Sequence, residues 1–200
     1  ALLPHITQQA KRHGAFVATN PGTSQLTENV STLLNSLEHI DIVITNRYEA
    51  TLLMKSICAP VAQKQKSPDL PDLLAAPIVS RSGCFTLQNY FKDTLSRGPS
   101  IVVVTNGADG VYVAHAKTIY YHPSLPVDVL STVGAGDACS SAFVGQIIKG
   151  NSIDHAIRAG ICNSASVIQH ISANKGILTQ KELNTRITSL DPSLLKQFAL

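Results

Sequence analysis

The feature that most constrains the fold is an unbroken apolar run of β-branched residues, Ile101-Val102-Val103-Val104-Thr105. A strand that is exposed on one face would alternate apolar with polar side chains, so this run is typical of a strand covered on both faces. Such strands occur in parallel sheets that carry helices on both sides. The run therefore predicts an α/β fold with a largely parallel central sheet.

Helical and strand patterns alternate along the rest of the chain, as this layered fold requires. Further strands are expected at 15–19 (buried), 40–45, 111–113 and 118–121, the last two as a hairpin around Ala116-Lys117. Helices are expected at 2–13, 26–37, 46–55, 86–95, 136–149, 153–169 and 179–190, with Asn46 as the cap of the third.

Four prolines interrupt the pattern between Pro60 and Gly83. Proline lacks a backbone donor and ends regular structure, so residues 60–83 are expected to form a surface loop or an insertion.

The bulk composition describes one folded domain over residues 1–200, because 44% of the chain is apolar and 14% is charged. The net charge of +3 is scattered, which argues against a nucleic-acid surface. No apolar run is long enough to span a membrane, and no signal peptide is recognisable. The four cysteines have no CxxC spacing and are expected to be free thiols in the cytoplasm, with Cys139 and Cys162 in the core.

A glycine-rich turn, Gly134-Ala135-Gly136-Asp137, stands at the start of a predicted helix. Backbone N–H groups in such a turn converge on an anion, and the helix dipole favours negative charge there. Asp137 would then lie beside a bound phosphate, where it could accept a proton from an attacking hydroxyl. The alternative is a tight helix-entry turn in which the acid stabilises the dipole.

With Ser131-Thr132-Val133 before it, this turn resembles the signature Asp-Thr-X-Gly-Ala-Gly-Asp of the ribokinase-like (PfkB) family of carbohydrate and nucleoside kinases. Asn46-Arg47-Tyr48-Glu49 is similar to the family's Asn-X-X-Glu motif, and residues 105–110 are similar to its Thr-X-Gly nucleotide loop. Asn20-Pro21-Gly22 is similar to a turn that closes an earlier strand. The resemblance covers nearly the whole chain and implies a three-layer αβα kinase fold.

The resemblance implies roles for the residues of the signature. Asp137 would be the general base, and Gly134, Ala135 and Gly136 would hold the transferring phosphate. Ser131 replaces the family's aspartate, which leaves any side-chain role of that position open. The carbonyls of Ser131 and Val133 would be possible ligands of a monovalent cation such as K⁺.

The other motifs imply the sites of Mg²⁺ and ATP. Asn46 and Glu49, at i and i+3, would order Mg²⁺ through its water shell, although a capping asparagine with a first-turn glutamate is the structural alternative.

The nucleotide would contact the loop after the β-branched run, which has neither Rossmann nor P-loop spacing. The residues expected to make this contact are Thr105, Asn106, Gly107 and Gly110. Asn20, at the carboxyl end of a strand, would neighbour the substrate.

A late segment, Val167 to Ala173, resembles the helix and turn that lie beside adenine in the family, with Ser172-Ala173 where relatives have Gly-Ala. Relatives often have an asparagine at the position of Ile161. With Asn163 nearby, the adenine contacts remain open. None of the seven histidines has metal-ligand spacing.

Kinases of this family are longer, and the N-terminal strands, the lid and much of their sugar pocket are not recognisable here. The chain is therefore expected to be the C-terminal portion of an ATP-dependent kinase that phosphorylates a sugar, sugar phosphate or nucleoside. The full-length protein could then be a homodimer. Two alternatives stay open: a non-catalytic nucleotide-binding or regulatory module of this fold, and an unrelated α/β phosphate-binding enzyme.

Overall fold

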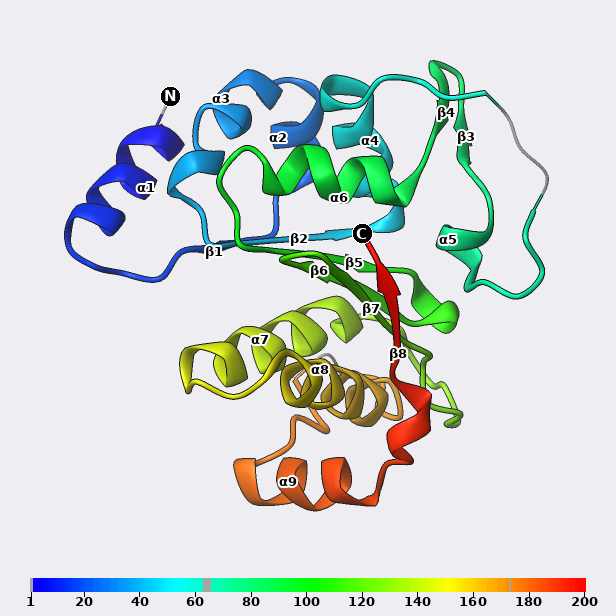
Figure 1. Ribbon diagram of the computed structural model, residues 1–200. Helices are drawn as coiled ribbons and strands as arrows, with labels where there is room; N and C mark the ends of the chain where they lie inside the picture. The colour runs from blue at the N-terminus through cyan, green and yellow to red at the C-terminus, as the bar shows by residue number, and fades with distance from the viewer. Residues whose placement is uncertain (1, 63–65, 173) are drawn as a thin grey trace. The chain divides into compact units, whose positions relative to one another are not determined.

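The computed structural model describes residues 2–62, 66–172 and 174–200 (Figure 1). These residues form two compact units. The first unit holds the described residues up to Val104 together with 113–119 and 198–200. The second unit holds 105–112 and 120–197.

A mixed, mostly parallel sheet of six strands confirms the predicted α/β class. The strands follow the order β1-β2-β5-β6-β7-β8, and β1 pairs with β2 in parallel, with Ala18 opposite Ile42. Their bounds are Ala18–Thr19, Ile42–Asn46, Ile101–Thr105, Val111–His115, Thr118–His122 and Lys196–Ala199. The sequence does not predict strand β8, because its residues Lys-Gln-Phe-Ala do not alternate between apolar and polar side chains.

The β-branched run is strand β5, and its first four residues are all buried, as predicted. In the same unit, α1 (Leu2–Arg12), α4 (Arg47–Ile57) and α6 (Leu87–Leu95) confirm three predicted helices. Tyr90 of α6 is fully buried, and its hydroxyl lies 3.2 Å from Thr45 Oγ1 of β2. A polar contact therefore ties this helix to the sheet inside an apolar core.

Two predictions in the first unit are wrong. The strand expected at 15–19 is reduced to β1, and Ala18 is exposed rather than buried. The helix expected at 26–37 is broken into α2 (Thr23–Thr27), α3 (Val30–Leu34) and the 3₁₀ turn η1 (Leu37–His39). Asn29 interrupts the helix at φ −125° and ψ 27°. Asparagine has a lower helix propensity than the neighbouring leucines, and the Asn29 side chain makes no capping hydrogen bond here.

The proline-rich segment 60–83 is more regular than expected. It contains the short helix α5 (Asp72–Ala75) and strand β3 (Ile78–Ser80), which pairs antiparallel with β4 (Gly83–Phe85). Elements of three or four residues are too short to show periodicity, so the sequence could not predict them. Residues 63–65 lie outside the described residues, and whether the segment is an insertion stays a prediction.

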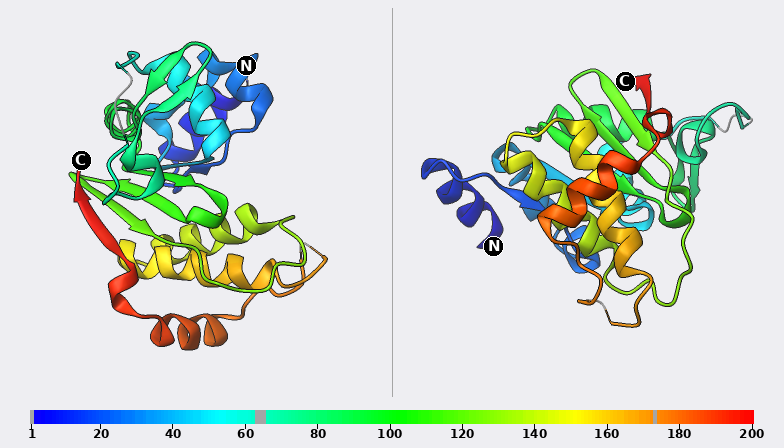
Figure 2. Two further views of the ribbon diagram at one scale, coloured as in Figure 1. Left: turned by 90° about the vertical axis from the view of Figure 1, so that its right-hand side faces the viewer. Right: turned by 90° about the horizontal axis from the view of Figure 1, so that it is seen from below.

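The second unit contains three predicted helices, α7 (Ala135–Ile148), α8 (Ile153–Val167) and α9 (Gln180–Ser189). Figures 1 and 2 show α7 beside α8. The two helices approach closely at Gly160, where a Cβ atom would lie 3.0 Å from the Cys139 carbonyl oxygen. Buried Cys162 packs with Leu183 of α9, so Cys139 and Cys162 are core residues, as predicted.

None of the helices formed by the described residues combines the length and apolar character needed to cross a lipid bilayer.

Candidate functional site

The glycine-rich turn forms the N-terminus of α7. Gly134 has the left-handed conformation, with φ 83° and ψ −4°, which glycine adopts without steric cost. The Thr132 carbonyl accepts a hydrogen bond from Ala135 N–H (3.2 Å), and the Gly134 carbonyl accepts one from Ala138 N–H (2.9 Å). Among the described residues, the N–H groups of Gly136 and Asp137 have no acceptor. The turn thus presents two free donors at the positive end of a helix dipole, which is the chemistry of an anion site.

A pocket of about 420 Å³ lies in the second unit beside this turn. Thr132, Ala135 and Gly136 contribute to its lining, whereas Asp137 does not. The Asp137 side chain, in the first turn of α7, is exposed. The structure therefore places the small residues of the turn in the pocket wall and leaves the carboxylate accessible outside it.

The pocket wall comes from three further parts of the second unit. One is the loop after β5 with the 3₁₀ turn η2 (Gly107–Asp109), another is the extended segment 124–129, and the third is α8. Leu130 N–H and Ser131 N–H both donate to the Ile168 carbonyl, at 2.9 and 3.2 Å, so the end of α8 is fastened to the loop that precedes α7. These bonds hold two walls of the pocket together.

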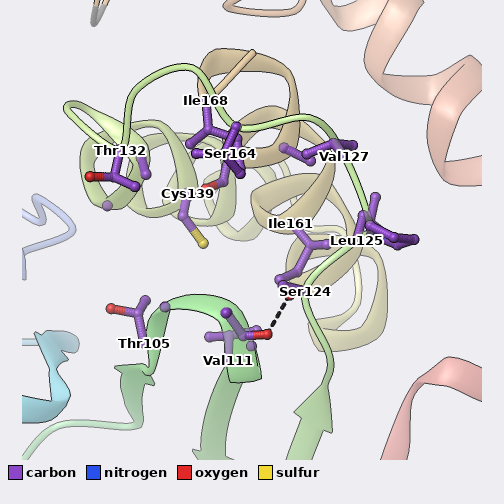
Figure 3. Close-up of a pocket in the computed structure, with 18 residues that line it drawn as sticks. Thr105, Val111, Ser124, Leu125, Val127, Thr132, Cys139, Ile161, Ser164 and Ile168 are labelled. Carbon is purple, nitrogen blue, oxygen red and sulfur yellow. Dashed lines mark hydrogen bonds between the residues drawn. The ribbon is translucent and has the colours of Figure 1, made fainter.

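The two ends of the pocket differ in polarity. Figure 3 shows the Thr105 and Thr132 side chains at one end and those of Leu125 and Val127 at the other, with Ile161 between them on α8. An amphiphilic ligand with a polar part and an apolar ring system matches this arrangement.

The loop after β5 brings three of its four predicted ligand-binding residues to the pocket, namely Thr105, Gly107 and Gly110. Gly110 is also required by packing, because at φ 122° a Cβ atom would lie 2.1 Å from the His122 carbonyl oxygen. Asn106 is not part of the lining. Its side-chain amide donates to Asp109 Oδ2 at 3.1 Å and thereby braces the loop.

Three predicted site residues of the first unit meet at the start of α4. Asn46 Oδ1 accepts a hydrogen bond from Glu49 N–H (2.9 Å), and Glu49 Oε2 accepts one from Asn46 N–H (2.8 Å). Asn20 donates to the Ile44 carbonyl (2.8 Å) and to Glu49 Oε2 (3.3 Å). The capping box expected as the structural alternative is thus present.

Glu49 Oε1 receives no hydrogen bond in the described part of the chain. The donor set consists of amide and carboxylate oxygens, which suit a hydrated Mg²⁺ ion. No group of three or more His, Cys, Asp or Glu side chains among the described residues could hold a metal ion directly.

Comparison with known proteins shows which family the chain resembles. Residues 85–180 match the model of the pfkB family carbohydrate kinases. Ribokinase of Haemophilus influenzae is 30% identical over 175 residues, which are 88% of this chain and 48% of that protein. Adenosine kinase 1 of Arabidopsis thaliana is 39% identical over 70 residues, which are 34% of this chain and 20% of that protein.

Among solved structures, an E. coli protein described as a ribokinase II, in complex with ATP and Mg²⁺, has a TM-score of 0.68. It is 20% identical, and the match covers 91% of this chain and 51% of that one. The chain has a ribokinase-like fold and is similar in sequence to the PfkB family carbohydrate kinases. It spans about half the length of the curated ribokinases that it matches over most of its own length.

The PfkB signature departs from its usual form at Ser131, and the structure shows what the serine does. Ser131 Oγ accepts a hydrogen bond from Val133 N–H at 3.3 Å. A serine can therefore brace the turn locally, as an aspartate would. No described donor reaches the carbonyls of Ser131 and Val133.

Sequence reasoning missed most of the apolar pocket wall. Leu125 and Val127 belong to an irregular segment around Pro126, which carries no periodic signal. Asn163, considered near the adenine contacts, is instead structural. Its amide donates to the Ala138 carbonyl (2.9 Å), and its Oδ1 accepts from Leu178 N–H (2.9 Å). Of the Ser172-Ala173 turn, Ala173 lies outside the described residues.

Proposed function

We propose that this chain carries the nucleotide-binding and phosphoryl-transfer part of an ATP-dependent kinase. The acceptor is a hydroxyl group of a sugar, a sugar phosphate or a nucleoside. The observation that carries the proposal is the pair of free N–H groups at Gly136 and Asp137, beside a pocket with one polar and one apolar end. The names of the relatives, ribokinase and adenosine kinase, support the same chemistry.

The nucleotide fits the pocket in one orientation. Its base takes the apolar end formed by Leu125, Val127 and Ile161, and its ribose and phosphates extend toward the hydroxyls of Thr105 and Thr132. The terminal phosphate then reaches the turn before α7, where unpaired backbone donors and the helix dipole stabilise its charge. Small residues at 134–136 let the phosphate approach the main chain.

Asp137 is the general base in this proposal. Its exposed carboxylate adjoins the free N–H groups, so an acceptor hydroxyl beside the terminal phosphate would lie within its reach. A carboxylate is a weak base at neutral pH, but it suffices because the hydroxyl becomes acidic late in a loose transition state. Asp137 then holds the proton of the hydroxyl while the new P–O bond forms.

Asn46 and Glu49 are the residues that we propose to order Mg²⁺, through waters bound to Glu49 Oε1. When bound, the ion neutralises charge on the phosphates. The carbonyls of Ser131 and Val133 are the proposed ligands of a monovalent cation, which fits their lack of hydrogen-bond donors. A cytoplasmic location is supported by the four free cysteines.

The test is Asp137→Asn in the protein encoded by the complete open reading frame. We expect nucleotide binding to stay within about threefold of wild type, while turnover with a panel of sugars and nucleosides falls about 10²- to 10⁴-fold. Asp191→Asn removes the same charge from another exposed acid of the second unit, one that lies outside the pocket lining, and should keep its turnover. Retained turnover in Asp137→Asn would show that this carboxylate is not the base. Binding without any turnover in the wild type would favour a non-catalytic nucleotide-binding module.

A further inference from the structure

We propose that the pocket accepts either purine nucleoside triphosphate, ATP or GTP, with little preference between them. The inference rests on the proposed function, since it assumes that the base occupies the apolar end. Its basis is the chemistry of the side chains that would surround the base. These side chains would recognise the shape of a purine ring system but not the hydrogen-bond donors and acceptors at its edge.

The walls of the base end are aliphatic. Ile161 and Ala165 of α8, which are 6% and 5% exposed, form one side of this end. Leu125 and Val127 face them from the extended segment (Figure 3). Flat apolar walls bind the faces of a ring system through burial and dispersion, which are equal for adenine and guanine to a first approximation.

A single side-chain hydroxyl of α8, that of Ser164, lines the pocket, and Figure 3 shows Ser164 beside Ile168, between Thr132 and Val127. Ser164 is half-buried, and its Oγ has no hydrogen-bond partner among the described residues. A serine hydroxyl rotates and both donates and accepts. It can therefore accept from the 6-amino group of adenine or donate to the 6-oxo group of guanine. Ser124, the other serine of the lining, already donates to the Ala108 carbonyl at 2.5 Å.

The lining residues include no charged side chain and no side-chain amide in the described part of the chain. Figure 3 shows the Cys139 sulfur directed into the pocket. Burial raises the pKa of this thiol to about 12, so it stays neutral at physiological pH. These side chains therefore lack the strong hydrogen-bond donors and acceptors that would distinguish adenine from guanine.

The same walls distinguish purines from pyrimidines. A pyrimidine base has one ring in place of two and leaves part of the aliphatic surface in contact with water. The loss of this buried area should weaken CTP and UTP by about tenfold or more relative to the purine nucleotides.

The experiment measures the affinities of ATP, GTP, CTP and UTP for the full chain by calorimetry at one Mg²⁺ concentration. We expect the dissociation constants of ATP and GTP to agree within about threefold and those of CTP and UTP to be about tenfold higher or more. Ser164→Ala should weaken both purines alike, and Ile161→Ala should do the same, so that the ratio of ATP to GTP affinity is unchanged in both variants.

The other possible results contradict either the inference, the placement of the base or the proposed function. A preference of more than tenfold for one purine, or a ratio that shifts in Ser164→Ala, would contradict the inference while leaving the nucleotide site in place. It would indicate that main-chain groups or Ser164 read the base edge. Equal binding of all four nucleotides would show that the base does not occupy the aliphatic end. If no nucleotide binds, the proposed function fails as well.

Discussion

Asn46 and Glu49 cap each other across the first turn of α4, each side chain accepting a hydrogen bond from the backbone N–H of the other residue. Glu49 Oε2 accepts hydrogen bonds from Asn46 N–H and from the Asn20 side chain, whereas Glu49 Oε1 accepts none in the described part of the chain. Because an aquated Mg²⁺ ion needs few direct protein ligands, one carboxylate can cap the helix and also order the ion's water shell. The structural and the functional interpretation are thus compatible and can be separated by substitution.

Glu49→Gln is expected to keep the cap and lose the metal function. Glutamine at this position still accepts from the Asn46 N–H, so the free energy of unfolding should change by less than about 0.5 kcal/mol. The charge that attracts Mg²⁺ is lost, so half-maximal activity should require several-fold more Mg²⁺. Urea unfolding and a Mg²⁺ titration of kinase activity measure the two effects.

Glu49→Ala is the matched control, because it removes both functions. It should cost about 1 kcal/mol of stability in addition to the shift in Mg²⁺ dependence. An unchanged Mg²⁺ titration in Glu49→Gln would mean that this pair is a helix cap and nothing more.

Gly134 and Gly136 are expected to respond in opposite ways to alanine. Gly136 lies inside α7, and a Cβ atom there would meet no atom within 4 Å. Gly136→Ala should therefore stabilise the fold by up to about 1 kcal/mol through helix propensity. The new methyl group would occupy space that the phosphate needs, so ATP affinity should fall about tenfold or more.

Gly134→Ala forces a non-glycine residue into the left-handed region and should cost about 1–2 kcal/mol in stability. Thermal unfolding and ATP titration of both variants make the comparison. Tighter or unchanged ATP binding in Gly136→Ala would place the phosphates elsewhere.

The parts of the site that sequence predicted are those with local causes. The left-handed Gly134 follows from the Gly-Ala-Gly turn, and the Asn46 cap follows from its spacing to Glu49. Strand β5 was predictable for a similar reason, since burial on both faces requires a continuous apolar run.

The rest depends on tertiary packing. The pocket exists because an irregular segment around Pro126 lies opposite Ile161 of α8, and no periodicity connects those two positions. Spacing alone also could not distinguish a ligand-binding Asn163 from a structural one.

Asn163 is predicted to be a stability residue with little effect on nucleotide binding. Its buried side chain joins the Ala138 carbonyl of α7 to the Leu178 N–H before α9. Asn163→Leu would leave both backbone groups unsatisfied, at a cost of about 1–3 kcal/mol each. Denaturant unfolding should show the loss, and ATP affinity of the folded variant should stay within about threefold. A large loss of ATP affinity without a loss in the free energy of unfolding would indicate that Asn163 contacts the nucleotide.

His122 is predicted to make stability depend on pH. The residue is fully buried, and its Nδ1 lies 2.7 Å from the Pro123 carbonyl. A carbonyl only accepts, so Nδ1 carries the proton of the neutral ring, and Nε2 is left as an unpartnered acceptor. Burial lowers the pKa of His122 below its ordinary value, and the nearby Arg158 lowers it further, against opposing effects of the Pro123 hydrogen bond and Asp154.

Because the folded protein holds His122 neutral, the unfolded chain binds more protons between pH 6.5 and the lower folded-state pKa. Stability from this residue is therefore present above pH 6.5 and is lost as the pH falls through the folded-state pKa. In urea unfolding at pH 7.5, 6.5 and 5.5, His122→Gln should show a smaller decline in the free energy of unfolding than wild type. His13→Gln, which replaces an exposed histidine, should decline as wild type does. Parallel declines in all three proteins would show that His122 does not contribute to the pH dependence.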